Sequence, residues 1–211
     1  MVMGKSGAQA LWRVALSLAV MLAALPGPAH AQFSDSYKFL EAVRKKDGTK
    51  VEAMLSEPGT TIINTRDVTS GESALHIATA RRDVTWMSFM LGKGANANIR
   101  DNRGVTPLVL AASLGFIEGV ELLVEQKARI DESSDTGETP LIGAVHARNI
   151  PLMRILLKAG ASPDRADNSG RSARDYATLD GRSSPLLSEI EANAKPAAAR
   201  RAGAATYGPS L

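Results

Sequence analysis

The sequence predicts an all-α repeat solenoid of helix-turn-helix units. Gly71, Gly104, Gly137 and Gly170 stand 33 residues apart, and each opens a similar string of residues. Hydroxyl residues follow these glycines at a fixed distance, and apolar residues recur in the same register further on. A period of 20 to 50 residues is typical of solenoids, in which each unit buries its apolar face against its neighbours.

The first helix of each unit is predicted by its start. Thr106-Pro107 and Thr139-Pro140 follow their glycines, and Ser73 and Ser172 stand at the same place in the other two units. A hydroxyl at the N-cap accepts a backbone N–H, and proline suits the first helical position because its missing donor would have no partner there. Each helix then passes an alanine in one common column, which predicts close stacking: Ala78, Ala111, Ala144 and Ala177.

The second helix of each unit is predicted by apolar residues in register, with steps that describe one face of a helix. The columns are Val84, Ile117 and Ile150; Met87, Val120 and Met153; Met90, Leu123 and Leu156; Leu91, Val124 and Leu157.

A closing turn follows each second helix. Gly94 and Gly160 suit the left-handed backbone that ends helices, and the turns lead on to Asn98, Asp131 and Asp164. Lys127 replaces the glycine in the middle unit, where a left-handed backbone costs about 1 kcal/mol, so we expect that turn to be reshaped.

The pattern G-x-T-P-L-x-x-A, an apolar second helix and then L-L-x-x-G-A, repeated every 33 residues, resembles the ankyrin repeat. His76 matches the family's T-P-L-H histidine, whereas Val109 and Ile142 fill that column in the next units. The resemblance implies stacked helix pairs with β-hairpin loops. It also implies that the polar bridge usually drawn from this histidine exists only once.

The repeat region is expected to be capped at both ends, because terminal units replace one stacking face with a polar one. Residues 32–66 read as a divergent N-terminal capping repeat, with helices around 39–43 and 51–55. Residues 67–194 read as three central repeats and a C-terminal cap, in which Arg174 and Asp175 replace the usual residues and Pro185 opens the last helix. Residues 195–211 are basic and rich in alanine, proline and glycine, which predicts disorder. The alternative is an electrostatic tether to an anionic envelope surface.

Residues 1–31 are predicted to be a secretory signal peptide cleaved after Ala31. Lys5 and Arg13 precede a charge-free apolar run over 14–25, and Ala29-His30-Ala31 offers a cleavage site. The run is short of the roughly 20 residues that span a bilayer. We therefore expect export across the inner membrane to a bacterial periplasm, with an uncleaved, membrane-tethered form as the alternative. The chain has no cysteine, so an exported fold must hold through packing alone.

Charge and composition argue against nucleic-acid binding and catalysis. Without Lys5 and Arg13 the chain has 23 basic and 22 acidic residues. This net charge near zero gives no broad positive field to attract the phosphates of a nucleic acid. Beyond residue 31 the histidines are His76 and His146, and no sequence motif for zinc, a nucleotide or a nucleophilic triad is present. We therefore predict no catalytic residue, no metal site and no cofactor. His146 is interpreted as a hydrogen-bonding surface residue, with a metal ligand or a pH switch as the alternative.

In ankyrin proteins, as the resemblance implies, partners dock on the concave side formed by the first helices and the hairpin tips. Leu114 is the expected apolar anchor, with Arg81, Arg103 and His146 as its polar rim. Trp86 either packs at the junction with the N-terminal cap or is exposed as a contact. The partner-binding candidates are Arg81, Asn102, Arg103, Val105, Ser113, Leu114, Asp135, Thr136, Glu138, His146, Asn168, Ser169 and Arg171.

The function that follows is an exported, monomeric, non-enzymatic scaffold that binds another protein. The alternatives are a dedicated inhibitor, or a protective accessory, of one envelope or secreted enzyme. No local motif identifies the partner, because solenoids recognise partners through scattered side chains on a shared fold.

Overall fold

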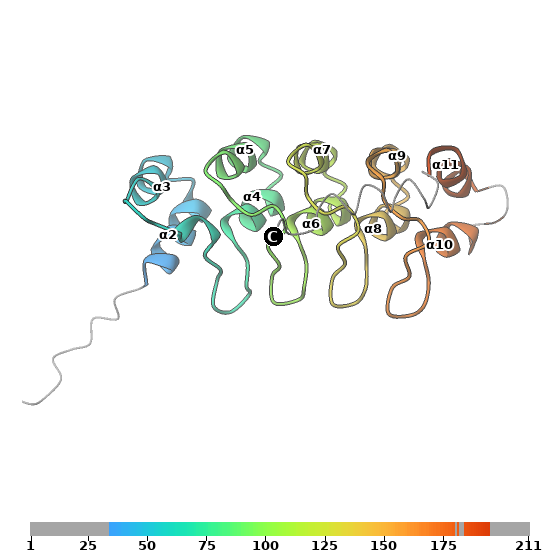
Figure 1. Cartoon of the computed structure of the whole chain (residues 1–211), viewed down its shortest axis with the longest axis horizontal. Coiled ribbons are helices and arrows are strands. Elements are labelled where there is room, and N and C mark those ends of the chain that lie inside the picture. The colour runs from blue at the N-terminus through green and yellow to red at the C-terminus, as the bar shows by residue number, and fades with distance from the viewer. Residues whose placement is uncertain (1–33, 180, 182–183, 195–211) are drawn as a thin grey trace, which may run out of the picture. The chain divides into compact units, whose positions relative to one another are not determined.

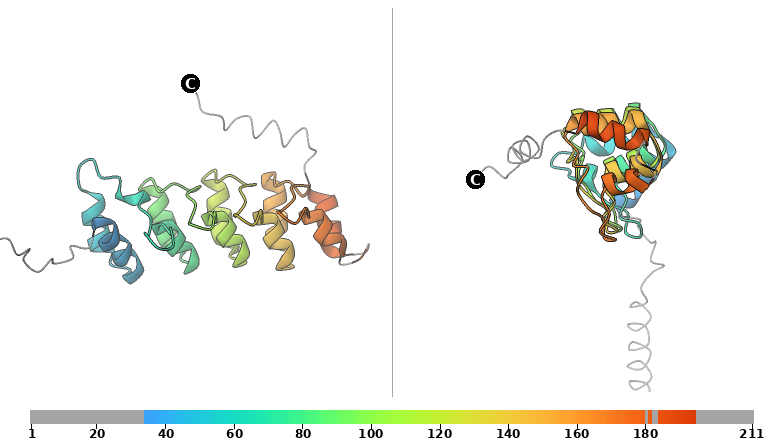
Figure 2. Two further views of the ribbon diagram at one scale, coloured as in Figure 1. Left: turned by 90° about the horizontal axis from the view of Figure 1, so that it is seen from below. Right: turned by 90° about the vertical axis from the view of Figure 1, so that its right-hand side faces the viewer.

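The computed structural model describes residues 34–179, 181 and 184–194. From residue 35 on, the helices form two rows (Figure 1), and successive pairs follow one another along the array (Figure 2). This confirms the predicted all-α repeat solenoid; the described residues hold two isolated β-bridges and no strand. The pairs are α2 (Asp35–Lys45) with α3 (Gly48–Leu55), α4 (Ala74–Ala80) with α5 (Val84–Gly92), α6 (Pro107–Ser113) with α7 (Ile117–Glu125), α8 (Pro140–His146) with α9 (Ile150–Ala159), and α10 (Ala173–Leu179) with α11 (Pro185–Asn193).

The first helices begin where the hydroxyl residues predict. The side chains of Ser73, Thr106 and Thr139 each accept a hydrogen bond from the backbone N–H three residues on, at 3.2 to 3.4 Å. At the last unit, Ser172 accepts from the Asp175 N–H at 3.2 Å, while the Asp175 carboxylate accepts from the Ser172 N–H at 2.8 Å. Asp175 thus completes a reciprocal cap in the unit that departs from the family pattern.

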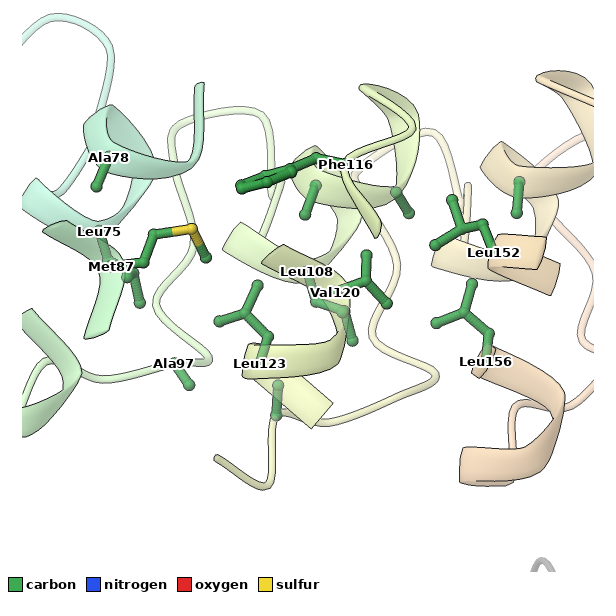
Figure 3. Packing of buried hydrophobic residues seen from close by; sticks show 14 of the residues in the cluster. Leu75, Ala78, Met87, Ala97, Leu108, Phe116, Val120, Leu123, Leu152 and Leu156 are labelled. Atoms are coloured by element: carbon green, nitrogen blue, oxygen red, sulfur yellow. The ribbon is translucent and has the colours of Figure 1, made fainter. Parts of the chain in front are cut away.

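The core lies between the two rows and runs through every unit. Ala78, Ala111, Ala144 and Ala177 are all buried, and each first helix packs against the first helices on either side. Figure 3 shows side chains of successive units lying against one another, among them Met87 and Leu123. Burying a side chain of this size stabilises the fold by about 1.5 to 3 kcal/mol. The core is therefore continuous, and it depends on the contacts between neighbouring units.

The turn at Lys127 is not reshaped, so that expectation was wrong. Lys127 has a φ of +61°, in the left-handed region where Gly94 also lies. The N–H of Ala128 donates to the Leu123 carbonyl at 2.9 Å, as the N–H of Ala95 does to the Met90 carbonyl. The packing of α7 on both sides therefore holds a lysine in a backbone conformation that normally favours glycine.

The first helix pair is attached to the array mainly through α2. The helix α2 packs on α4, and a 3₁₀ turn, η1 (Ile62–Asn64), packs against α2 and α3. The Arg81 guanidinium donates to the carbonyls of Val43 and Arg44 at 2.9 and 3.2 Å, where α2 ends. Trp86 is half-buried against the core and meets the Phe89 ring of its own helix edge-on at 5.9 Å, so it is not freely exposed; its packing at the junction with the N-terminal cap stays a prediction.

Two predicted segments, the signal peptide over 1–31 and the tail over 195–211, lie outside the described residues. Within the part that the structure describes, each helix is too short or too polar to cross a bilayer.

Candidate protein-binding surface

Four hairpins lie beside the first helices, and we call the hairpins together with α4, α6, α8 and α10 the hairpin face (Figure 1). Each hairpin is closed by an N–H that donates to a carbonyl further on, as Asp101 does to Val105 and Asp167 to Arg171, both at 2.9 Å. The glycine of each repeat has a φ between +70° and +81°, which explains why glycine recurs at this position of every hairpin.

Aspartates at the start of three hairpins fix the turns. The Asp67 carboxylate receives the Arg44 guanidinium and the N–H groups of Ser70 and Thr69, and these bonds lower the pKa of Asp67 to about 2. Burial raises the pKa of Asp101, but the N–H groups of Val105 and Arg103 outweigh it and hold that pKa below its usual range. Hydroxyl groups of Ser169 and Tyr176, together with backbone N–H groups, likewise lower the pKa of Asp167.

Successive hairpins are joined to one another by a ladder of hydrogen bonds. The Asn102 amide donates to the Thr69 carbonyl at 3.0 Å, and the Asn168 amide to the Asp135 carbonyl at 2.7 Å. The backbone N–H of Asp135 completes the series by donating to the Arg103 carbonyl at 2.9 Å. Three of the predicted contact residues, Asn102, Asp135 and Asn168, therefore hold the surface together.

Close approach of the next hairpin is a second reason for glycine in the inner hairpins. A Cβ on Gly137 would lie 2.6 Å from the backbone nitrogen of Asn168, whereas a Cβ on Gly170 would meet nothing within 4 Å. The hairpins therefore stack as tightly as the backbone allows, and the surface that they form is fixed before any partner arrives.

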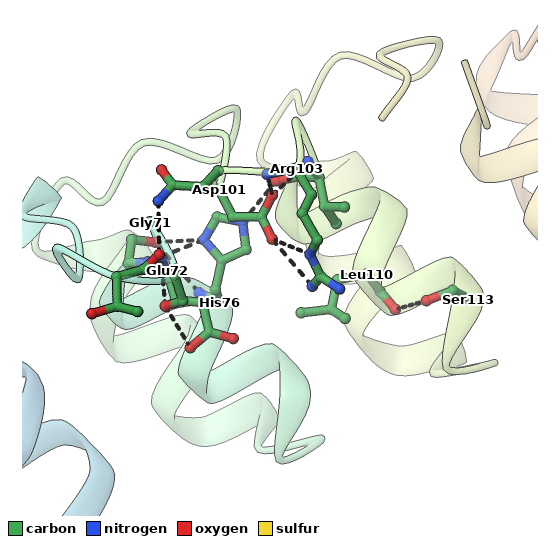
Figure 4. A network of polar contacts seen from close by, with 12 residues as sticks. Gly71, Glu72, His76, Asp101, Arg103, Leu110 and Ser113 are labelled. Carbon is green, nitrogen blue, oxygen red and sulfur yellow. Dashed lines mark hydrogen bonds and ion pairs between the residues drawn. The ribbon is translucent and has the colours of Figure 1, made fainter. Parts of the chain in front are cut away.

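His76 bridges the first and second units. Its Nε2 donates to the Val105 carbonyl at 3.0 Å, and its Nδ1 accepts the Ser73 N–H at 3.2 Å (Figure 4). Burial lowers the pKa of the His76 imidazole, which favours the neutral ring that this pair of bonds requires. Val109 and Ile142 occupy the same column without such a bridge, as the sequence predicts.

Several other candidates are engaged within the molecule. Arg81 caps α2, and the Ser113 hydroxyl donates to the Leu110 carbonyl of its own helix at 2.9 Å. Leu114 is half-buried against the core, and its carbonyl accepts from Arg82, so it offers little apolar surface as an anchor. Val105 is half-buried, and its carbonyl receives His76. Arg103 is the most available of this group, since its side chain is 76% exposed beside Asp101.

The remaining candidates gather in the last two units. His146 Nδ1 lies 3.4 Å from the Glu138 carboxylate, and the His146 ring meets the Tyr176 ring edge-on at 4.4 Å between centroids. The Ser169 hydroxyl lies 2.7 Å from Asp167, and Arg171 lies over the Tyr176 ring at 6.0 Å. Thr136 is exposed, with its hydroxyl 2.7 Å from that of Ser134.

The partner-binding candidates predicted from the sequence leave out three residues on or beside this face: Val68 and Leu179, which are exposed, and Tyr176, which is half-buried. Val68 is an extra residue, because the N–H of Asp67 closes its hairpin on Glu72, one residue further than in the other hairpins. The signal was a spacing of 34 from Asp67 to Asp101, against twice 33 from Asp101 to Asp167. Leu179 stands in a column that is exposed in every repeat, with Ala80, Ser113 and His146.

The described residues contain no group of three or more histidines, aspartates and glutamates arranged to hold a metal ion. The hairpin face instead offers hydrogen-bonding groups, aromatic rings and a few aliphatic side chains on a fixed backbone. Such a surface can bind a macromolecule by shape and complementarity.

Comparison with known families identifies this arrangement. Residues 39–134 match the family described as ankyrin repeats (3 copies), and residues 136–168 match a further ankyrin repeat. The chain belongs to the ankyrin-repeat family, whose repeats are generally protein-interaction domains without catalytic activity.

Relatives with this repeat come from animals, plants and a virus. The ANK repeat-containing protein nipk-1 of Caenorhabditis elegans is 29% identical over 67% of this chain and 24% of its own length. A Transient receptor potential cation channel subfamily A member 1 homolog of the same organism is 34% identical over 51% of this chain and 9% of its own length. The putative ankyrin repeat protein FPV031 of Fowlpox virus is 36% identical over 46% of this chain and 30% of its own length. This chain thus spans less than a third of each relative.

Proposed function

We propose that this protein is an exported scaffold that binds another protein through the hairpin face and catalyses no reaction. One observation supports this most directly. The ladder of bonds from Asn102 and Asn168 locks neighbouring hairpins together, so the face loses little ordering entropy when a partner docks. Ankyrin repeats suggest the binding role; export, a monomeric state and the absence of nucleic-acid binding are further parts of the proposal.

Affinity capture from an envelope extract tests the binding face with a matched pair of variants. Ser113→Arg places a long cation at the end of α6, and Ser88→Arg places the same group on an exposed position of α5, in the other row. We expect Ser113→Arg to reduce recovery of the partner at least tenfold and Ser88→Arg to leave it unchanged. Equal recovery by both variants would show that the partner binds elsewhere.

Export is tested by N-terminal sequencing of the protein from its host. We expect the mature chain to begin at Gln32, because the apolar run ends before the small-residue triplet that closes at Ala31. A chain that retains Met1 would instead support the tethered alternative.

The second candidate function is a dedicated inhibitor, or a protective accessory, of one envelope or secreted enzyme. A face fixed in advance is compatible with one very tight complex as well as with several moderate ones. Activity assays of the captured partner distinguish these roles: an inhibitor abolishes turnover, an accessory preserves it during heating, and an adaptor leaves it unchanged.

A further inference from the structure

The last unit of the hairpin face carries exposed apolar surface. Leu179, in the last turn of α10, is 70% exposed, and Tyr176 lies three residues before it on the same helix. Residues three apart on a helix are neighbours, and His146 stacks against Tyr176 from α8. We call His146, Tyr176 and Leu179 together the C-terminal patch.

The C-terminal patch is held rigidly. The Tyr176 hydroxyl donates to the Asp167 carboxylate at 2.7 Å. The Ser169 hydroxyl lies 3.3 Å from the Tyr176 hydroxyl. His146 is positioned from two sides, by the Tyr176 ring and by Glu138. Aromatic groups fixed in this way contribute a large contact area at a small entropic cost, which is typical of the residues that dominate binding energy.

Two opposite charges flank the C-terminal patch at the same position of successive hairpins. Glu138 and Arg171 are 33 residues apart, each directly after its repeat glycine. The Glu138 carboxylate lies beside His146, and the Arg171 guanidinium lies over the Tyr176 ring. Hydrogen bonds from Ser172 lower the pKa of Asp175, and the charge of Arg171 also helps to lower it. Elsewhere on the face, Arg103 is paired with Asp101, and Glu72, in the same column of the first hairpin, receives the Ser70 hydroxyl at 3.2 Å. Glu138 and Arg171 are the two charges of that column that lie beside the C-terminal patch.

We propose that the C-terminal patch is the anchor of the hairpin face and that it binds a segment of a protein carrying a bulky apolar side chain between a basic and an acidic side chain. The apolar group packs on Leu179 and Tyr176, the basic group faces Glu138 and the acidic group faces Arg171. This inference rests on the proposed protein-binding function and names the chemistry of the partner. It moves the anchor from Leu114, which is engaged in the core, to Leu179.

Val68 is a weaker candidate for the anchor although it is 93% exposed. It stands alone at the tip of the first hairpin, where the neighbouring Asp67 carboxylate is already bonded to Arg44. Val68→Ser is therefore the matched control for Leu179→Ser, since both remove an exposed aliphatic side chain without opening the core.

A phage-displayed library of random 16-residue peptides, selected on the purified protein, supplies the probe. We expect the enriched peptides to share an apolar residue flanked by one basic and one acidic residue. Measured by fluorescence polarisation, their affinity should fall at least tenfold for Leu179→Ser and stay unchanged for Val68→Ser. The double variant Glu138→Arg/Arg171→Glu keeps the net charge and should prefer peptides with the two charges exchanged.

Thermal unfolding of each variant checks that the fold is intact. Peptides that bind Leu179→Ser and the charge-exchange variant as tightly as the original protein, but lose affinity for Ser113→Arg, would overturn this inference and leave the proposed function standing. Peptides that bind every variant equally, or no enrichment at all, would contradict both.

Discussion

The first and second repeat units, residues 67–100 and 101–133, share a backbone but differ in how it is stabilised. The first has His76 bridging to the next unit, Asp83 capping α5 and a glycine, Gly94, in the closing turn. The second places an apolar or strained residue in each of these columns: Val109, Phe116 and Lys127. The same helix-turn-helix unit is therefore stabilised by polar contacts in the first repeat and mainly by apolar packing in the second.

The residue in each of these columns depends on the residues that pack against it within the same unit. Phe116 accepts no capping bond at the start of α7, and its buried ring lies over Gly119. Gly119 stands in the column where the first unit has Trp86. The glycine leaves space for the ring, which shows that columns compensate for one another within a unit. Exchanging one residue between the units should therefore be unfavourable unless its compensating partner moves with it.

The largest effect is expected when His76 of the first unit is replaced by valine, the residue that the second unit has in that column. His76→Val leaves the Val105 carbonyl and the Ser73 N–H without their buried partner, so we expect the free energy of unfolding to fall by about 2 kcal/mol at pH 8. Urea unfolding followed by circular dichroism measures this change.

The cost of His76→Val should also depend on pH. Because the folded-state pKa of His76 is lowered from its ordinary 6.5, the unfolded chain binds the proton more readily. The stabilisation by His76 is full above pH 6.5 and is lost as pH falls below it, so the difference between the two proteins should narrow from pH 8 to pH 5.5. A difference that widens toward low pH would contradict the neutral bridge.

The second effect tests the compensation between Phe116 and Gly119. Alanine is favoured over glycine inside helices by about 1 kcal/mol, yet a Cβ on Gly119 would clash with the Phe116 ring. We expect Gly119→Ala to destabilise the protein by about 1 to 2 kcal/mol net, because crowding in a packed site outweighs helix propensity.

Gly92→Ala in α5 is the control for Gly119→Ala. A Cβ there meets nothing within 4 Å, so we expect it to stabilise the protein by about 0.5 to 1 kcal/mol. If both variants proved stabilising in thermal and urea unfolding, Phe116 would not require the glycine.

The sequence predicts the fold well because each element has a local cause: an N-cap hydroxyl, an apolar column or a left-handed glycine. It predicts the surface less well, for a physical reason. Positions that vary between repeats were interpreted as free for a partner, but the varying column of Asn102, Asp135 and Asn168 makes bonds that join hairpins. Which hydroxyl or amide reaches a neighbouring unit depends on how the units stack, and one extra residue at Val68 or an exposed Leu179 leaves the 33-residue period intact.

The third effect has the opposite sign. Lys127 keeps a left-handed φ of +61° in a turn where the first unit has Gly94, so Lys127→Gly should remove backbone strain and stabilise the protein by about 1 kcal/mol. Lys93→Gly, where φ is −88°, should instead destabilise it slightly because glycine only adds freedom to the unfolded chain. Equal changes for the two variants would show that the Lys127 turn stores no strain.

The smallest effect sharpens the comparison at the hairpins. Asp135 stands in the column of Asn102 and Asn168, but its carboxylate cannot donate to the preceding hairpin as their amides do. In Asp135→Asn the new amide would reach the Asn102 carbonyl, and we expect a gain of about 0.5 kcal/mol. The exposed contact of Asp135 with Arg100, at 3.4 Å, is lost, but such surface pairs contribute little and are screened by salt. The gain should therefore rise slightly in 1 M NaCl.

Asp135→Ala is the control, because it loses the ion pair without gaining a donor. An asparagine variant no more stable than the alanine variant would show that the backbone hydrogen bond alone joins these two hairpins.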